Sequence, residues 1–282
     1  MDEWRRISKE ENRDWAKYTS KETRLWVSKS LGSKVVVDYK VGAITAISSA
    51  KSSREAEIKV KKHLFKILLE SDTWDLLDIN GKRADSIEYA LVYVGTKDVG
   101  ISKERNEYKA ETILYLTGDH LQLRKERYRP FITKYANEAG LDVSLIEAII
   151  EIESHYNPMA VSKKNAIGLM QLIPDQAGAD AFKIVTGEVG EPTVQQLFDP
   201  EYNIKLGVTY LKHLYDRFHY VVDAKARSML VLISYNWGIG NVTKHMKPHA
   251  DIKYNDIQNR MAVVPKETKN YLSTLMNLTY IW

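Results

Sequence analysis

The pattern of apolar and polar residues divides this chain into two parts with different periods. Up to about residue 118, short runs rich in β-branched residues are separated by turn residues such as Gly32-Ser33 and Val41-Gly42, which is typical of strands joined by tight turns. The predicted strands cover residues 25–31, 34–40, 43–49, 89–95 and 109–117.

Two helices are predicted among these strands. The first spans residues 1–19 and would dock on its own domain or contact another protein; its apolar side carries Trp4, Ile7, Trp15 and Tyr18. The second spans residues 51–70, with Val60, Leu64, Ile67 and Leu68 on the buried side. Its other side carries a basic stripe, Lys59, Lys62 and Lys66, which is either a solvated face or a contact for an anionic polymer.

Residues 1–120 are therefore predicted to form an α+β accessory domain, because they contain no phosphate loop, metal-ligand spacing or catalytic cluster. From residue 121 to residue 282 the pattern is helical nearly to the end, and the chain as a whole is predicted to be α+β. The expected helices include 122–137, 226–235 and 269–280, and Gly207 suggests a close approach of two helices.

The segment from Leu145 to Pro174 organises the second domain. A helix starting near Asp142 or Ser144 carries Ile146, Ile149 and Glu153 in one narrow stripe, and Asn157-Pro158 ends it. Ser144 and Glu147 fit a capping box, and Glu147 and Glu151 point largely away from the stripe.

Glu153 therefore lies at the C-terminal end of a helix, beside apolar neighbours. Desolvation and the helix dipole both disfavour its charged form and raise the pKa of the carboxyl. A carboxylic acid that stays protonated near neutral pH can act as the general acid in glycosidic bond cleavage. The alternative is an ordinary surface acid at a helix break.

Four motifs in register favour the catalytic interpretation. They are Glu153-Ser154-x-x-Asn157-Pro158-x-Ala160-x-Ser162 with Ala166-x-Gly168-Leu169-Met170-Gln171; Asp199-Pro200 with Asn203-Ile204, Gly207 and Tyr210-Leu211; Ser234-Tyr235-Asn236 with Gly238 and Gly240; and Pro265-x-Glu267-Thr268-x-x-Tyr271-Leu272. Together they resemble the signature of lytic murein transglycosylases, whose SLT domain has the lysozyme-like fold. The resemblance covers about residue 121 to the C-terminus and departs from the family at Asn165 and Trp237, where many members carry glycine.

This resemblance implies that the second domain cleaves the β-1,4 bond between N-acetylmuramic acid and N-acetylglucosamine without water. Glu153 would be acid and then base, and the product would carry a 1,6-anhydromuramoyl end. Because the substrate's own N-acetyl group can stabilise the transition state, no second carboxylate is required. The alternatives are a lysozyme-type hydrolase that uses Asp175, Asp180 or Glu188 to position water, and a non-catalytic glycan-binding or scaffold protein.

The same resemblance implies roles in substrate binding for further residues of these motifs: Ser162, Met170, Gln171, Tyr235, Asn236 and Tyr271. From the residues alone, a turn serine is the alternative for Ser162, and Met170 could equally be a core filler. Trp237 could stack on a sugar ring or narrow the groove.

Composition limits the other possibilities. The 282 residues are 44% hydrophobic and 28% charged, with a net charge of +4 and no cysteine, so disulfides and thiolate chemistry are excluded. His245 and His249 flank Pro248 and do not form a zinc motif, so no metal or cofactor is expected. The basic stripe lacks interleaved aromatic residues, which argues against a nucleic-acid partner.

The expected partner is the peptidoglycan glycan strand. No apolar run is long enough to cross a membrane and the first residues lack a signal-peptide pattern, so membrane association would need a segment absent from this sequence. Family resemblance implies a periplasmic location, with attachment to the outer membrane as one form of it.

Overall fold

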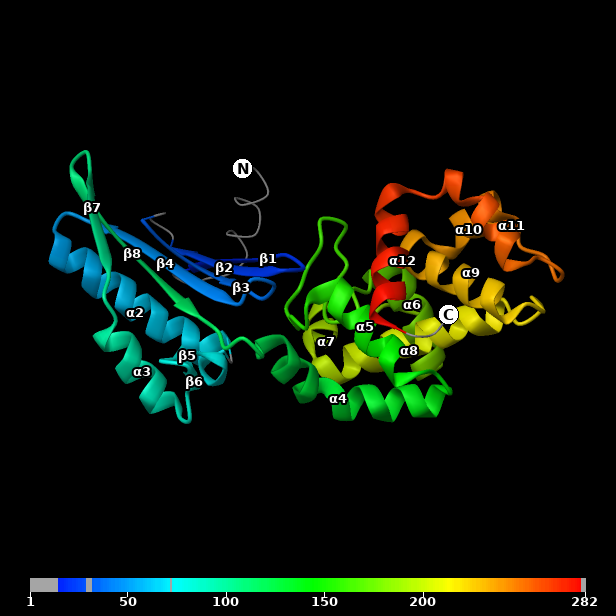
Figure 1. Ribbon diagram of the computed structural model, residues 1–282, viewed down its shortest axis with the longest axis horizontal. Helices are drawn as coiled ribbons and strands as arrows, with labels where there is room; N and C mark the ends of the chain where they lie inside the picture. Colours follow the sequence, from blue (N-terminus) through cyan, green and yellow to red (C-terminus); the bar gives the residue numbers. More distant parts are fainter. Residues whose placement is uncertain (1–14, 29–31, 72, 280–282) are drawn as a thin grey trace. The chain divides into compact units, whose positions relative to one another are not determined.

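The computed structural model describes residues 15–28, 32–71 and 73–279. The chain forms two compact units, Met1–Glu126 and Arg127–Trp282 (Figure 1). An antiparallel sheet in the first unit and a helical second unit confirm the predicted α+β class. Across the described ranges, no helix is both long enough and apolar enough to cross a bilayer.

The first unit is built on a six-stranded antiparallel sheet with the strand order β1-β2-β3-β4-β8-β7. Its strands are β1 (Trp15–Thr19), β2 (Thr23–Ser28), β3 (Ser33–Asp38), β4 (Ala43–Ala50), β7 (Gly100–Glu104) and β8 (Glu107–Tyr115). The connection from β4 to β7 holds α2 (Ser53–Ser71), a 3-10 turn (Trp74–Leu76), the small hairpin β5 (Asp78–Ile79) and β6 (Lys82–Arg83), and α3 (Ile87–Thr96).

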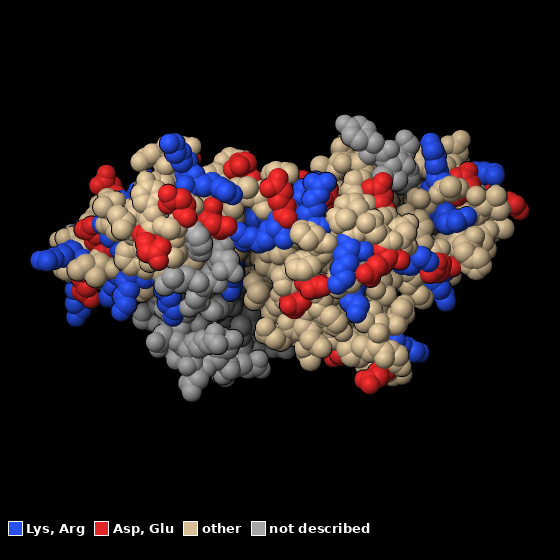
Figure 2. Space-filling model, turned by 90° about the horizontal axis from the view of Figure 1, so that it is seen from below, with Lys and Arg blue, Asp and Glu red and all other residues tan. Residues whose placement is uncertain are grey.

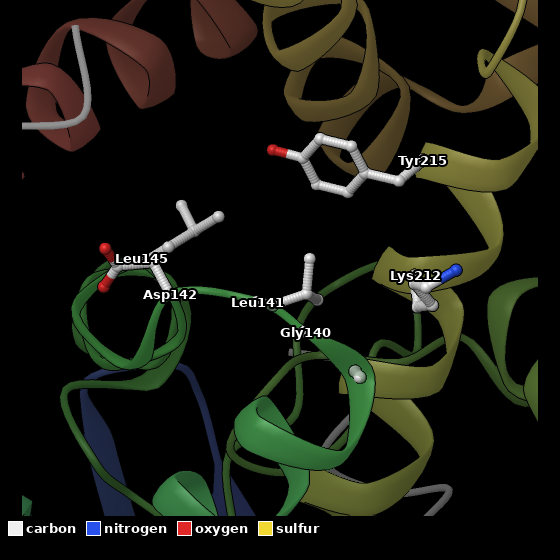
Figure 3. Close-up of a pocket in the computed structure, with 7 residues that line it drawn as sticks. Gly140, Leu141, Asp142, Leu145, Lys212 and Tyr215 are labelled. Carbon is white, nitrogen blue, oxygen red and sulfur yellow. The ribbon is translucent and has the colours of Figure 1, made fainter.

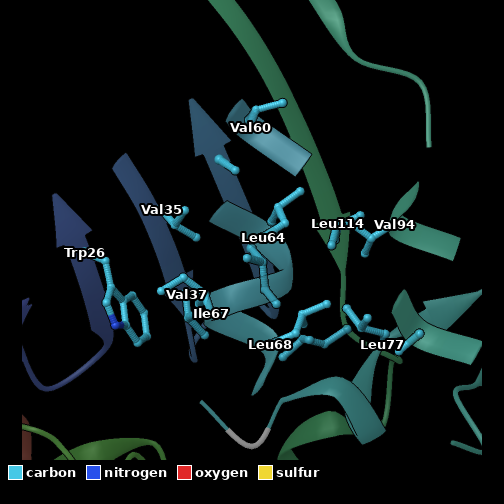
Figure 4. Close-up of a cluster of buried hydrophobic side chains, with 14 of the residues drawn as sticks. Trp26, Val35, Val37, Val60, Leu64, Ile67, Leu68, Leu77, Val94 and Leu114 are labelled. Carbon is cyan, nitrogen blue, oxygen red and sulfur yellow. The ribbon is translucent and has the colours of Figure 1, made fainter. Parts of the chain in front are cut away.

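Helix α2 packs on the sheet and α3 packs on α2, so one face of the sheet is covered (Figures 1 and 4). The four residues predicted to face inward from α2, Val60, Leu64, Ile67 and Leu68, are all buried there. They meet side chains of the sheet, among them Trp26, Val35, Val37 and Leu114. The basic stripe on the opposite side is at least partly neutralised, because Lys59 forms an i,i+4 ion pair with Glu55.

Two predictions for this unit are wrong. Residues 89–95 were expected to be a strand because of their valines, but they lie in α3, which Ser86 caps by accepting a hydrogen bond from the amide of Tyr89. Ala90 and Val94, four residues apart, are the buried pair of that helix, so packing overrides strand propensity.

The predicted helix over residues 1–19 is also wrong where it can be compared. Residues 15–19 form β1, which pairs antiparallel with β2 from Trp15↔Ser28 to Thr19↔Arg24. A turn stabilised by Ser20 Oγ, which accepts from the amide of Thr23, connects the two strands. Residues 1–14 of that prediction lie outside the described residues.

The second unit consists of helices. After α4 (His120–Ala139), which begins in the first unit, they are α5 (Val143–Ser154), α6 (Ala179–Thr186), α7 (Val194–Phe198), α8 (Pro200–Arg217), α9 (Ala224–Trp237), α10 (Ile239–Met246), α11 (Tyr254–Asn259) and α12 (Lys266–Leu278). Short turns cover Pro174–Gly178 and Met261–Val263. Helix α9, predicted to be central, contacts α8, α10, α11 and α12, and α12 also contacts α5.

We expect His63 on α2 to make the stability of the first unit sensitive to acid. Its Nδ1 lies 3.1 Å from Ser48 Oγ of β4. Burial, and then repulsion from Lys62, Lys59 and Lys66, lowers the pKa of His63 from 6.5 to about 4. The unfolded chain therefore binds the proton more readily, and the free energy of unfolding decreases as the pH falls from 6.5 towards 4.

We expect His63→Gln, which keeps a hydrogen-bonding group beside Ser48, to reduce this acid sensitivity. Thermal unfolding of the full chain at about pH 7 and about pH 5 should show a smaller decrease in Tm for the variant than for the natural sequence. His249→Gln, at an exposed position, is the matched control and should behave like the natural sequence. An unchanged decrease in His63→Gln would contradict this account.

Candidate active site

The candidate site is built on helix α5, whose N-terminal end is fixed by a side-chain cap. Asp142 caps the start, since its Oδ1 accepts from the amide and from the hydroxyl of Ser144, at 2.7 Å each. These bonds lower the pKa of the Asp142 carboxyl. The cap is therefore Asp142, and Ser144 makes no capping box with Glu147. Glu147 is only 6% exposed and its Oε1 lies 3.6 Å from Arg129 Nε, so this acid is buried at an ion pair.

The other end of α5 closes earlier than predicted. Its last residue is Ser154, and His155 and Tyr156 both have left-handed backbones, with φ of 50° and 55°. The buried ring of Tyr156 explains how this costly turn is held, because its hydroxyl donates to the carbonyl of Glu147 at 3.0 Å. Glu153, in the last turn of the helix, is only 4% exposed.

Two tyrosines from other helices lie close to Glu153. Tyr235 is near the end of α9 and Tyr271 is in α12. Burial, and next the negative charge of Glu153, raise the pKa of both phenols well above their usual value. Both hydroxyls therefore stay protonated and can donate hydrogen bonds to an oxygen in this space.

The two hydroxyls differ in their partners. Tyr235 Oη donates to the carbonyl of Met170 at 2.8 Å, and its ring lies 5.9 Å from that of Tyr210. The pKa of Tyr210 is raised to about 12, chiefly by burial and further by the charge of Asp180. Tyr271 is 5% exposed, and its Oη has no hydrogen-bond partner among the described residues.

The segment from Ala160 to Leu172 forms the adjoining loop. Val161 bridges to Ile167 and Ile167 to Leu172, as in a small irregular hairpin. Ser162 Oγ accepts from the amides of Lys164 and Ala166, so this serine organises a turn. Asn165 has φ of 60° in that turn, a left-handed backbone that asparagine tolerates better than most residues.

Gln171 and Met170 support the same loop from within. Gln171 Nε2 donates to the carbonyls of Ala160 and Gly168. The side chain of Met170 is fully buried, so its backbone carbonyl, not its thioether, is the part that meets Tyr235. Gly207 of α8 leaves the room for it, because a Cβ there would lie 2.3 Å from Met170 Sδ. The close approach predicted at Gly207 is thus to this loop and not to another helix.

Asn203 is the supporting residue whose role the sequence did not reveal. Its side chain is buried; Oδ1 accepts from the amide of Met170, and Nδ2 donates to the carbonyls of Ile167 and Leu197. A polar residue between buried positions of an apolar helix face was the available signal, because a buried amide requires several partners.

Asn236 and Trp237 follow Tyr235 in the chain, and each of them contacts a different residue. Asn236 Oδ1 accepts from the hydroxyl of Thr268, which ties the end of α9 to the first turn of α12. The half-exposed indole of Trp237 stacks on His245, with ring centroids 5.5 Å apart. The structure thus brings Glu153, Tyr235, Tyr271 and the carbonyl of Met170 together, with Asn236 beside them and Ser162 and Gln171 organising the loop.

An open hollow of about 280 Å³ lies at the opposite end of α5 (Figure 3). It is lined by Ala139, Gly140, Leu141, Asp142, Leu145, Lys212 and Tyr215. The ring of Tyr215 extends from α8 over this space. Leu145 and Glu153 are separated by about 12 Å along a helix, so this hollow is distinct from the site around Glu153.

Surface charge and potential metal ligands give no further indication of function among the described residues. Figure 2 shows lysine and arginine interspersed with aspartate and glutamate on the face it presents, without a broad surface of one sign. Among the described residues, no three histidine, cysteine, aspartate or glutamate side chains gather as a metal site requires.

Comparisons with known proteins bear on the second unit. Residues 130–258 match the family model described as Transglycosylase SLT domain. The chain is similar to membrane-bound lytic murein transglycosylase C of Histophilus somni, with 37% identity over 164 residues, 58% of this chain and 44% of the relative. The protein of the same name from Photorhabdus laumondii is 42% identical over 134 residues, 46% of this chain and 37% of the relative.

One solved structure with a similar chain is an inactive mutant of the lytic transglycosylase Slt from Pseudomonas aeruginosa. Identity is 27% and the TM-score 0.44, over 53% of this chain and 23% of that chain. The sequence matches confirm the resemblance that the motifs predict. The chain spans less than half the length of the curated relatives.

Gly207→Ala tests the packing beneath the loop. Alanine is the better helix former, yet the new Cβ would also lie 2.7 Å from Met170 Cβ, so we expect a net loss of about 1–3 kcal/mol in the free energy of unfolding. Gly240→Ala in α10 meets nothing within 4 Å and serves as the control. Denaturant unfolding that gives equal stabilities for the two variants would refute the packing argument.

Proposed function

We propose that this protein is a peptidoglycan lytic transglycosylase, because its residues 130–258 match the transglycosylase SLT domain model. It would cleave the β-1,4 bond between N-acetylmuramic acid and N-acetylglucosamine without consuming water. The observation that carries the proposal is the burial of one acid, Glu153, at the end of α5, close to Tyr235 and Tyr271, whose phenol pKa values are raised by burial and by the charge of Glu153.

In this mechanism Glu153 acts twice. Its carboxyl proton passes to the glycosidic oxygen as the bond to C1 of the muramoyl residue breaks, and N-acetylglucosamine leaves with its new hydroxyl. The resulting carboxylate then takes the proton of the muramoyl C6 hydroxyl, whose oxygen bonds to C1 and closes the 1,6-anhydro ring. The proton lent by Glu153 is returned, so the reaction balances without water or a cofactor.

The surroundings of Glu153 suit this use of a single acid. Tyr235 and Tyr271 cannot serve as bases near neutral pH because the pKa of each is raised well above its usual value. Their hydroxyls can instead donate to the substrate or to the carboxylate. Tyr271 is the better candidate for direct contact, since Tyr235 Oη is already bonded to the carbonyl of Met170.

The remaining predicted substrate-binding residues divide into two groups. Asn236 lies next to Tyr235 and would contact the glycan directly. Ser162, Met170 and Gln171 would act mainly by shaping the loop against which the strand lies, because their described bonds are within that loop or to it.

The setting of the enzyme follows from its substrate and relatives. Peptidoglycan lies in the periplasm, and the curated relatives are named membrane-bound, so we propose a periplasmic location with attachment to the outer membrane as one form of it. The first unit would be an accessory domain, since the described residues of the family motifs all lie in the second.

We expect Glu153→Gln to fold normally and to lose activity by roughly a thousandfold, the usual scale of general acid–base catalysis. Mass spectrometry of fragments released from purified peptidoglycan by the natural sequence should show products one water lighter than hydrolytic fragments. Reducing ends in their place would indicate a hydrolase. Binding to the wall without any products would indicate a scaffold protein, and substantial turnover by Glu153→Gln would exclude Glu153 as the acid.

Tyr271→Phe separates a functional hydroxyl from a structural one. Because Tyr271 Oη has no partner among the described residues, we expect no loss of stability and a decrease in kcat of roughly tenfold. Tyr235→Phe is the comparison: it removes the bond to the carbonyl of Met170 and should lower both Tm and kcat. Unchanged kcat in Tyr271→Phe would exclude its hydroxyl from the reaction.

A further inference from the structure

A rigid turn beside the site carries two exposed lysines. Residues 162–166 are fixed by backbone bonds between Ser162 and Ala166 and by Ser162 Oγ. Lys163 and Lys164 stand at its tip, and both are exposed. The base of this turn is the loop that supports Tyr235, so the lysines are held at a fixed place and not on a free segment.

One contact locates this turn relative to the catalytic residues. Lys164 Nζ lies 3.7 Å from Glu267 Oε2, in the first turn of α12. Glu267 and Tyr271 are four residues apart and therefore lie on the same side of α12, about 6 Å from each other. The negative charge of Glu153 raises the pKa of Tyr271, so Tyr271 lies close to Glu153. The turn with Lys163 and Lys164, which contacts the same side of α12, therefore lies at the rim of the candidate site.

In the ion pair between Lys164 and Glu267, another carboxylate can readily replace that of Glu267. Their side chains are 77% and 69% exposed, and an ion pair with such exposure contributes little to stability. Among the described residues, no acidic group lies within ion-pair distance of the neighbouring Lys163. A carboxylate brought by a ligand could thus bind both ammonium groups and displace Glu267 at little cost.

Peptidoglycan supplies such a carboxylate beside the scissile bond. The lactyl group of a muramoyl residue can carry a short peptide that bears free carboxylates. We propose that Lys163 and Lys164 bind a carboxylate of this peptide, so that the enzyme prefers strands with intact peptides to bare glycan. Glu267 occupies the carboxylate position when no peptide is present. This inference rests on the proposed function, and it adds that the same site distinguishes strands with peptides from strands without them.

The test compares two substrates, and it uses one variant that loses positive charge in the lysine turn and one that loses the negative charge of Glu267. Peptidoglycan strands are used intact or stripped of their peptides by an amidase, and kcat/KM is measured on both. For the double variant Lys163→Gln, Lys164→Gln, the preference for intact strands should decrease about tenfold, the scale of one lost charge-assisted contact. Glu267→Gln, which frees Lys164, should increase it. Lys212→Gln, which removes one lysine charge outside this turn by replacing the partner of Asp216 on α8, is the control for loss of positive charge as such.

Three outcomes would overturn the inference: an equal loss on both substrates, an unchanged preference, or the same effect from Lys212→Gln. The preference should also weaken as salt is raised from low to physiological ionic strength, because exposed charges are screened. Failure of the proposed function is visible separately, since then the natural sequence releases no anhydro products from either substrate.

Discussion

The buried side-chain amide of Asn203 is the interaction on which the candidate site depends. It bonds to three backbone groups, the amide of Met170 and the carbonyls of Ile167 and Leu197, and so fixes a loop that has little regular structure of its own. A buried amide costs little when its partners are present and much when one is lost. Because the carbonyl of Met170 receives the hydroxyl of Tyr235, the same amide also determines where α9 presents its tyrosine to Glu153.

Glu153 is placed by a different constraint, the abrupt end of its helix. Two consecutive residues with left-handed backbones, His155 and Tyr156, turn the chain away, and the bond from Tyr156 to the carbonyl of Glu147 holds that turn. The acid is consequently buried in the last helical turn, among phenols whose protons are firmly held. A site of this kind contains neutral hydrogen-bond donors near one carboxyl, which is consistent with the single-acid mechanism that we propose.

The sequence was sufficient where a pattern repeats within one element. The stripe of Ile146, Ile149 and Glu153 predicted a buried acid because a helix with this period must turn that side inward. The sequence was insufficient where contacts with residues distant in the chain determine the local structure. Residues 89–95 have a β-branched composition, yet they form a helix because Ala90 and Val94 are buried in the packed first unit. Likewise, nothing near Gly207 in the chain revealed that its neighbour would be Met170.

The loop from Ala160 to Leu172 has an inward side and an outward tip that meet different structural demands. Its inward side is fixed by contacts that tolerate little change: the buried Met170, the bonds of Gln171, and a glycine, Gly168, whose Cβ would strike Asn203. Its outward tip requires only a residue such as Asn165 that accepts a left-handed backbone and a hydroxyl such as that of Ser162 to close the turn. The positions between them meet no packing demand. Charge can therefore be placed at Lys163 and Lys164 without disturbing the packing around Glu153, so the proposed selection of strands would be independent of the proposed cleavage.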